Sequence, residues 1–408
     1  MRTAVMCAAL AAVFAASSVG AQTLNLTESE ALARLSTTDS PRTRAIRAAV
    51  DITRVDVLAA GRWPNPRLTF DREAVAGITE HMLMVAQPLP ITGRRGLDVK
   101  AASALVSASS SRVDDELRRL RADLRIAFAD VVAAQTRERE LSSARDRLRG
   151  LAGVIAKREE AGDVAGFDRL RADREVLDID TDRGIAATER ARAQALLASF
   201  LADVADPSRI LAVDRSRAPA AIPPLEALVE QAESSRGELL ALRQEIESAR
   251  FAERAADRRW IPEPEVVAGT KSSSVGGGDI GSVFTVHATI PLFDHAHPER
   301  ALAIARGSQA EARVIAFRQT LRGQIAALRT AVVERRDAAE RYRAQAVNTA
   351  DQIERIAQVS YDAGERSILE LLDAYRTGST ARVRQAALDA SVRQAEIELE
   401  FASGWEIQ

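Results

Sequence analysis

The chain has 408 residues, of which 46% are hydrophobic and 28% are charged, so it can fold and is not a disordered polyelectrolyte. The formal net charge of −2 excludes bulk electrostatic attraction to nucleic acid. Aromatic residues make up only 4%, which is low for a protein with several compact cores, whereas abundant Ala, Arg and Glu favour helices.

The N-terminal segment differs from the rest of the chain. Arg2 precedes an apolar run over residues 4–19 that ends in small residues, which predicts a secretory signal peptide over residues 1–21, cleaved before Gln22. The single cysteine, Cys7, lies inside this segment, so the mature protein would lack cysteine ligands and nucleophiles. Nothing after it approaches the roughly 18 consecutive apolar residues of a transmembrane helix. An exported protein is therefore expected.

Several motifs recur at a spacing of about 200 residues, which predicts two copies of one structural unit. The pairs are Arg62-Trp63-Pro64-Asn65-Pro66 with Arg259-Trp260-Ile261-Pro262-Glu263-Pro264, Gln87-Pro88-Leu89 with Ile290-Pro291-Leu292, and Glu160-Ala161-Gly162-Asp163 with Asp362-Ala363-Gly364-Glu365. We therefore expect a first repeat over residues 22–206, a Pro-rich linker over 207–224 and a second repeat over 225–408.

The first repeat is expected to begin with a helix over residues 28–61, which the Trp-Pro motif ends because proline cannot continue a helix. Two short strands, 67–72 and 80–87, come next. A helix over 94–160 follows, 67 residues long and spanning roughly 100 Å. The chain then turns at Gly162, and a second helix runs over residues 167–201.

The second repeat is expected to follow the same order. A helix over 225–259 leads to strands at 265–271 and 282–290, the latter alternating apolar and mostly polar residues. A long helix starts at Pro298, the chain turns at Gly364, and a last helix covers 368–401.

These elements predict a mainly α protein with a small antiparallel β part. Helices this long must pack along their length against other long helices. Four short strands cannot close a membrane barrel, for which about eight are needed. Either several chains share one barrel, and three chains would supply twelve strands, or the strands form a small soluble sheet.

The motifs together resemble the outer-membrane efflux protein family, the trimeric channel-tunnels, and look most like its heavy-metal efflux branch. The resemblance covers nearly the whole mature chain, in order and in both repeats. The residues that carry it are Trp63-Pro64-Asn65-Pro66, Gln87-Pro88-Leu89-Pro90, Gly93-Arg94-Arg95, Glu160-Ala161-Gly162-Asp163, Ile290-Pro291-Leu292-Phe293-Asp294, Tyr361-Asp362-Ala363-Gly364 and Asp373.

The resemblance implies a homotrimer with a twelve-stranded β-barrel in the outer membrane of a Gram-negative bacterium and an α-helical tunnel across the periplasm. It implies a periplasmic adaptor (membrane fusion) protein as partner and a proton-driven inner-membrane pump as the energy source. No cofactor and no nucleic acid are expected. No Gly-rich phosphate loop follows a strand and no Gly-x-Ser-x-Gly elbow occurs, so no enzymatic activity is expected.

The resemblance also marks two sets of site residues. The first is the pair of hairpin tips, expected to contact the adaptor; the alternative is a plain glycine-terminated turn. Its residues are Ala161, Gly162, Asp163, Ala363, Gly364, Glu365, Arg366 and Ser367.

The second set is a pore constriction formed by Glu370 and Asp373, three residues apart on one helix face. Threefold symmetry would place six carboxylates around one axis, which favours cations. The alternative is an ordinary solvated helix face. The first repeat has Asp168 at the first position but Arg171 at the second, so the sequence leaves open whether both repeats contribute to a complete ring.

The histidines suggest a metal site only weakly. His295 and His297 follow the last strand near Asp294, and two histidines with an acid can bind a transition metal. The same position suits a capping turn between strand and helix, so no metal site is expected.

The function expected is a passive, gated exit duct of a tripartite efflux pump for heavy-metal cations. One alternative is the same duct for drugs or other small organic compounds, or for type I protein secretion. Another is a soluble periplasmic coiled-coil scaffold, which the alternating strands argue against.

Overall fold

The computed structural model describes residues 23–37, 40–162, 165–214 and 220–405. The predicted signal peptide and Asp163 lie outside the described residues. The chain divides into two compact units whose boundary falls within three long helices. Unit 1 comprises Met1–Ser40, Arg121–Ala220 and Ala331–Ile397, and unit 2 comprises Pro41–Leu120, Ala221–Thr330 and Glu398–Gln408.

Unit 2 contains a four-stranded antiparallel sheet in the order β2-β3-β5-β6. The strands are β2 (Arg67–Val75), β3 (Ile78–Pro88), β5 (Pro264–Ser273) and β6 (Ile280–Ala288), and a short 3₁₀ turn (Val275–Gly277) lies between the last two. The register places Leu68 opposite Val85 and Ala268 opposite Phe284. All four predicted strands are confirmed; β2, β3 and β5 are slightly longer than predicted, and β6 has the predicted length but begins two residues earlier.

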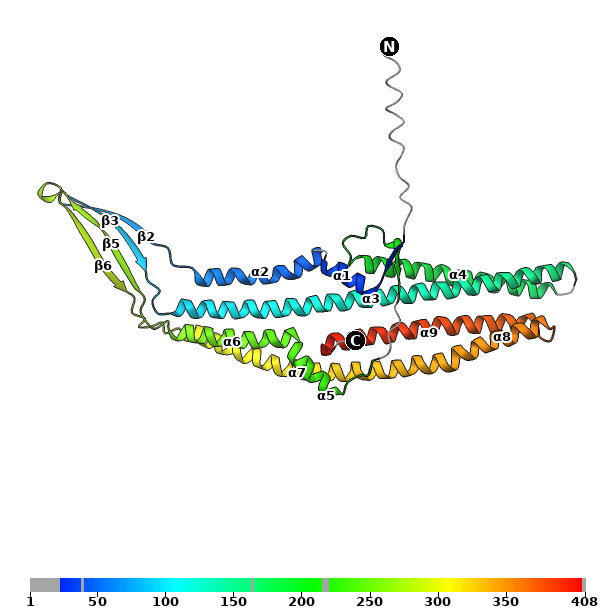
Figure 1. The fold of residues 1–408 in the computed structure, drawn as a ribbon. Coiled ribbons are helices and arrows are strands. Elements are labelled where there is room, and N and C mark those ends of the chain that lie inside the picture. The colour runs from blue at the N-terminus through cyan, green and yellow to red at the C-terminus, as the bar shows by residue number, and fades with distance from the viewer. Residues whose placement is uncertain (1–22, 38–39, 163–164, 215–219, 406–408) are drawn as a thin grey trace, which may run out of the picture. The chain divides into compact units, whose positions relative to one another are not determined.

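Helices lead into and out of this sheet at its lower end (Figure 1). Helix α2 (Pro41–Gly61) precedes β2 and helix α6 (Gly237–Asp257) precedes β5, and each ends before the Trp-Pro motif of its repeat. Helix α3 (Arg94–Glu160) follows β3 with the predicted bounds, and helix α7 (His297–Tyr342) follows β6.

Unit 1 contains two helical hairpins, visible in Figure 1 as pairs of helices that run side by side. The C-terminal part of α3 pairs with α4 (Gly166–Ala198), and α8 (Asn348–Asp362) pairs with α9 (Ile368–Ser403). A five-residue π-helical turn (Arg343–Val347) separates α7 from α8, so the last long helix is interrupted where the sequence predicts continuity.

A second, smaller sheet lies in unit 1 and was not predicted. Strand β1 (Leu24–Leu26) pairs in parallel with β4 (Ile210–Ala212), which follows a 3₁₀ turn (Pro207–Arg209) inside the expected linker. The Gln135 side chain joins α3 to β4, because it donates to the Ala212 carbonyl at 3.0 Å and accepts from the Ala212 N–H at 2.9 Å.

The helix expected at the start of each repeat is in fact two helices. The first repeat has α1 (Glu28–Thr37) and α2, and the second has α5 (Leu225–Ser235) and α6. Between α5 and α6, Arg236 is extended at φ −72° and ψ 119°, because its buried guanidinium pairs with Asp115 at 3.2 Å. The prediction of continuous helices over 28–61 and 225–259 was therefore wrong.

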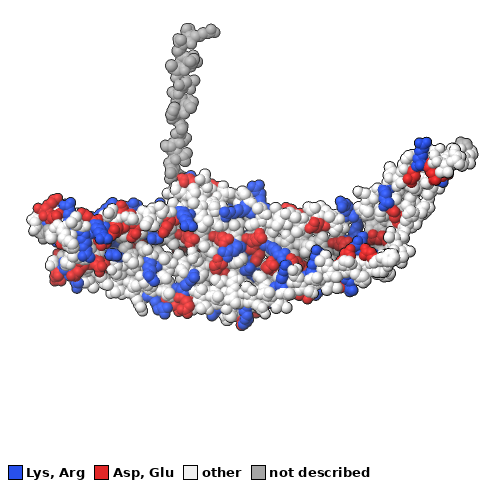
Figure 2. Space-filling view, turned by 180° about the vertical axis from the view of Figure 1, so that it is seen from behind, with Lys and Arg blue, Asp and Glu red and all other residues white. Residues whose placement is uncertain are grey.

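None of the helices in the described part of the chain combines the length and apolar character needed to cross a membrane. Their surfaces are mixed in charge: Figure 2 shows Lys and Arg interspersed with Asp and Glu along the helices seen from that side. No basic stripe of the kind that binds nucleic acid is visible on this face.

Candidate functional site

The two hairpin turns are closed by glycines in the left-handed conformation. Gly162 has φ +83° and Gly364 has φ +77°, values that residues with a Cβ rarely adopt. The Gly364 N–H donates to the Tyr361 carbonyl at 2.9 Å, and the next two N–H groups donate to the Ser360 carbonyl. The predicted tip residues within the described part are all exposed: Ala161, Gly162, Ala363, Gly364, Glu365, Arg366 and Ser367.

Both tips rest on one apolar cluster of unit 1, so their positions are linked. The largest fully buried members are Ile155 from the first hairpin and Leu371 from the second. A turn that protrudes from such a core keeps its backbone shape while its side chains stay exposed. The remaining buried members are Leu148, Leu151, Ala152, Ala172, Ala357, Tyr361, Ile368, Leu372 and Ala374.

The two predicted constriction acids differ in their surroundings. Glu370 forms an ion pair with Arg366 one turn earlier, and both side chains are about half exposed. Asp373 is exposed and lines a groove of about 540 Å³ between α9 and the π-helical turn. Arg376 lines the same groove. The two acids lie near the same end of α9, and within the described residues Asp373 has no ion pair.

The two histidines lie in a turn. The His295 and His297 rings are 5.9 Å apart between centroids, and Ala296 between them has φ +57°. The Asp294 carboxylate accepts a hydrogen bond from the Ala296 N–H at 3.0 Å, as in an Asx turn, just before α7 begins. Within the described residues no group of three or more His, Cys, Asp or Glu side chains could hold a metal ion.

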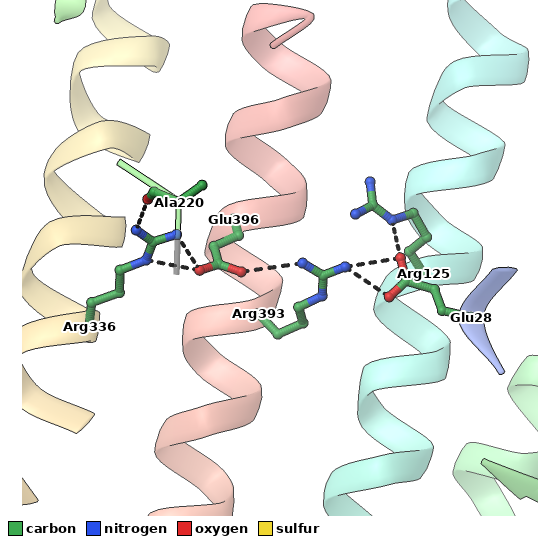
Figure 3. Close-up of polar contacts among 6 residues, drawn as sticks. All are labelled: Glu28, Arg125, Ala220, Arg336, Arg393 and Glu396. Carbon is green, nitrogen blue, oxygen red and sulfur yellow. Dashed lines mark hydrogen bonds and ion pairs between the residues drawn. The ribbon is translucent and has the colours of Figure 1, made fainter. Parts of the chain in front are cut away.

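A chain of partly buried ion pairs crosses unit 1 and was not predicted from the sequence. Figure 3 shows it: Arg336 contacts Glu396, Arg393 contacts both Glu396 and Glu28, and Arg125 contacts Glu28. These contacts join α7, α9, α1 and α3, and their side chains are only 12–20% exposed.

The same side chains also contact two connecting segments, the linker before α5 and the start of α1. Arg336 donates from Nη1 to the Ala220 carbonyl of the linker at 2.7 Å. Glu28 is the first residue of α1 and lies between Thr27 and Glu30, which cap that helix. Burial raises the pKa of Glu28, but Arg393 and Arg125 outweigh it and hold that pKa below its ordinary value.

A second charged cluster lies closer to the hairpin tips. Arg382 on α9 contacts three acids, Glu140 on α3 at 3.1 Å and Asp351 and Glu354 on α8 at 2.7 Å each. The close approach of Glu354 requires Gly378, because a Cβ at that position would lie 1.6 Å from its carboxylate oxygen. Arginine and acids are so abundant here that no local pattern could have singled out either cluster.

The four-stranded sheet has one apolar and one charged face. The charged face carries ion pairs between Lys271 and Glu80 at 2.6 Å and between Arg67 and Glu265 at 3.3 Å. Only Arg72 and His81, near the β2–β3 turn, interrupt the opposite face with ionisable groups. Large apolar side chains on that face are 45–72% exposed: Leu68, Phe70, Leu83, Val85, Phe284 and Val286.

Comparisons with known proteins agree with this geometry. Residues 228–405 match the family model described as "Outer membrane efflux protein". The predicted resemblance to the outer membrane efflux proteins is confirmed. The cobalt-zinc-cadmium resistance protein CzcC of Cupriavidus metallidurans is 22% identical over 347 residues, covering 85% of this chain and 82% of that protein.

Solved structures of outer membrane channels have the same fold. The CmeC outer membrane channel of Campylobacter jejuni superposes with a TM-score of 0.76 at 13% identity, covering 92% of this chain and 85% of that one. A crystal structure of CusC gives 0.74 at 14% identity, covering 93% and 92%. The predicted mainly helical fold is confirmed. The sequence also predicted an outer-membrane location and no enzymatic role, and both predictions agree with the outer membrane efflux proteins that the chain matches.

Proposed function

We propose that this chain forms the passive, gated exit duct of a tripartite efflux pump, assembled as a homotrimer and carrying heavy-metal cations. The observation that carries the duct is the sheet with one exposed apolar face in a chain that matches the outer membrane efflux proteins. The relative named for cobalt, zinc and cadmium resistance supports metal cations over drugs, small organic compounds or secreted proteins.

The sheet suits a shared barrel. Its outer strands, β2 and β6, are antiparallel to each other in direction, since three antiparallel pairings separate them. Strand β6 of one copy can therefore continue the antiparallel pattern with β2 of the next, and three sheets of four strands make twelve. A closed barrel leaves no unpaired strand edge in lipid, and the apolar face would lie outward.

The helices suit a tunnel made by the same three copies. Helix α4 has exposed apolar residues at Phe167, Leu170 and Leu177, and α8 has them at Ile356 and Val359. These helices are the outer members of their hairpins, so α4 of one copy can pack against α8 of the next. Burying such stripes would add roughly 1.5–3 kcal/mol for each large side chain fully covered.

The repeated order of elements supports the two-repeat organisation. A pair of strands and then a helical hairpin occurs once within residues 22–206 and once within 225–408. We propose that the hairpin tips Ala161-Gly162-Asp163 and Ala363-Gly364-Glu365-Arg366-Ser367 contact the periplasmic adaptor, and that an inner-membrane pump, proton-driven in our proposal, supplies the energy. Exposed tips on a shared core give the adaptor a defined surface.

The proposed cation preference rests on Asp373 and Glu370. Because Glu370 is paired with Arg366, we expect Asp373 to contribute the larger part of the negative potential. In planar bilayers, Asp373→Ala should lower cation selectivity and weaken block by multivalent cations, and Glu370→Gln should do so less. Unchanged conductance and selectivity in Asp373→Ala would refute the constriction.

Two further experiments separate the alternatives. Deleting the gene should sensitise cells to divalent heavy-metal ions; sensitivity to drugs alone, or loss of a secreted protein alone, would favour the other ducts. Cell fractionation should recover the protein as a trimer with the outer membrane. A soluble periplasmic monomer would instead support the coiled-coil scaffold.

A further inference from the structure

Each of the four connections between helix and sheet in unit 2 carries an exposed large apolar side chain. Trp63 (54% exposed) and Trp260 (61%) precede strands β2 and β5. Ile91 (70%) and Phe293 (97%) follow strands β3 and β6. Because the sheet is antiparallel, the starts of β2 and β5 and the ends of β3 and β6 lie at the same end of it. All four connections at this end of the sheet therefore expose a large apolar side chain, and we call Trp63, Ile91, Trp260 and Phe293 together the rim.

The rim is strongly basic around Trp63. Residues 61–67 and 89–96 include four arginines and no acid. The Arg95 guanidinium lies over the Trp63 ring at 5.0 Å from its centroid and donates from Nη1 to the Gly61 carbonyl at 2.8 Å. The neighbouring Arg62 is exposed. An indole ring with one guanidinium over its face is thus held at the surface, and a second, exposed arginine precedes it in the sequence.

Two of the four arginines have carboxylate partners and contribute little free charge. Arg67 pairs with Glu265 at 3.3 Å, and Arg94 pairs with Glu263 at 3.5 Å. The positive charge next to the ring therefore comes from Arg62 and Arg95.

The corresponding position in the second repeat offers a natural contrast. Trp260 also follows two arginines, but Arg259 pairs with Glu299 and Arg258 donates to the Thr92 carbonyl at 3.0 Å. Among the described residues no guanidinium lies over the Trp260 ring, so the contact of Arg95 with Trp63 has no counterpart in the second repeat.

We propose that Trp63, Arg62 and Arg95 bind the headgroup of a glycerophospholipid with net negative charge. The phosphodiester would accept hydrogen bonds from the guanidinium groups, and the indole would lie at the boundary between headgroup and acyl chain. A zwitterionic headgroup is disfavoured because its ammonium group meets the same arginines. Trp260 would contact lipid without selecting its charge. This inference rests on the proposed outer-membrane function.

The three tryptophans of the chain make the test specific, since each can be left as the only fluorophore. The trimer carrying Trp260→Phe and Trp405→Phe reports on Trp63 alone, and the trimer carrying Trp63→Phe and Trp405→Phe reports on Trp260. Both are reconstituted into phosphatidylethanolamine vesicles containing a minor fraction of either phosphatidylglycerol or phosphatidylethanolamine brominated in its acyl chains. Quenching as a function of brominated lipid gives the relative affinity at each tryptophan.

We expect Trp63 to favour phosphatidylglycerol by about fivefold or more, and Trp260 to show no preference. Arg62→Gln and Arg95→Gln should each reduce the preference at Trp63, whereas Arg54→Gln, an exposed arginine paired with Asp51 on α2, should leave it unchanged. The preference should weaken in high salt.

Equal quenching of Trp63 by the two lipids overturns the proposal, and so does a preference that survives both arginine substitutions. If neither lipid quenches Trp63 while the same trimers conduct ions across planar bilayers, a neighbouring copy covers the ring and the proposal is wrong although the duct stands. If neither tryptophan is quenched and no conductance appears, the outer-membrane function fails and this inference fails with it.

Discussion

Replacing Arg393 with methionine tests whether the chain of partly buried ion pairs stabilises unit 1. Arg393 donates to both oxygens of Glu28, at 2.8 and 3.0 Å, and to Glu396 at 3.3 Å. Removing one member of a buried pair usually costs about 3–5 kcal/mol, because the other charge is left uncompensated. Here Glu28 keeps Arg125 and Glu396 keeps Arg336, so we expect a loss of roughly 2–3 kcal/mol, below the full range.

The loss should depend on pH in a defined direction. The pKa of Glu28 is lowered in the folded protein, so its ion pairs stabilise the fold at pH values above its ordinary pKa of 4.5. That contribution is lost as the pH falls through the lowered folded value. The stability difference between wild type and Arg393→Met should therefore be full near pH 7 and shrink as the pH falls below about 4.5.

Urea unfolding of the detergent-solubilised protein, followed by circular dichroism at several pH values, measures this difference. Arg54→Met is the matched control, because Arg54 and Asp51 form a pair that is 65% and 69% exposed and should contribute at most about 0.5 kcal/mol. The reasoning is refuted if Arg393→Met is no less stable than Arg54→Met at pH 7, or if its deficit does not change with pH.

Three other substitutions probe single features. Gly237→Ala should destabilise unit 2 by several kcal/mol, since the new Cβ would lie 2.1 Å from the Ser111 carbonyl oxygen; a change within about 0.5 kcal/mol in urea unfolding would contradict this. Gln135→Leu should cost roughly 2–4 kcal/mol and raise hydrogen exchange at Ala212, because both backbone groups of Ala212 lose their side-chain partner; unchanged exchange there would count against it. Gly364→Val should strain the second hairpin tip, because the residue at this position must adopt φ +77°. This variant should retain less adaptor in a pull-down than the control Gly323→Val in α7, and equal binding would argue against docking at the tip.

The bounds of α3 were predicted from the sequence, whereas the two split helices were predicted as continuous although each break has a local mark. Residues 97–149 contain neither Gly nor Pro and repeat apolar residues every three to four positions, so nothing local interrupts the helix. At Arg236 a buried pair with Asp115, more than 100 residues earlier, fixes an extended backbone, and Gly237 beside it is the local mark of the break. At the first split, Pro41 begins α2 and marks the break in the same way.

Strand β4 and the charge clusters escaped prediction because both depend on partners far away in the sequence. A three-residue strand such as Ile210–Ala212 is too short to show alternation, and it exists because β1 lies beside it. The hairpin tips were found because the left-handed turn requires glycine at Gly162 and Gly364 whatever surrounds them. Local backbone requirements are thus readable in this sequence, and long-range charge pairing is not.

Ion pairs between long helices can fix the helix register where the side chains between the helices are small. Alanine makes up about half of the buried apolar residues that the structure describes. Two alanine-rich helices can slide past one another by a turn with little change in buried area, so apolar packing alone specifies their register weakly. An arginine that must meet carboxylates on two other helices, as Arg382 does, is satisfied at one register only. We therefore expect that replacing Arg382 together with its three acids by apolar residues of similar size would preserve stability. The same change should broaden the distribution of distances between spin labels on α3 and α9. A distribution as narrow as that of the wild type would show that packing alone sets the register.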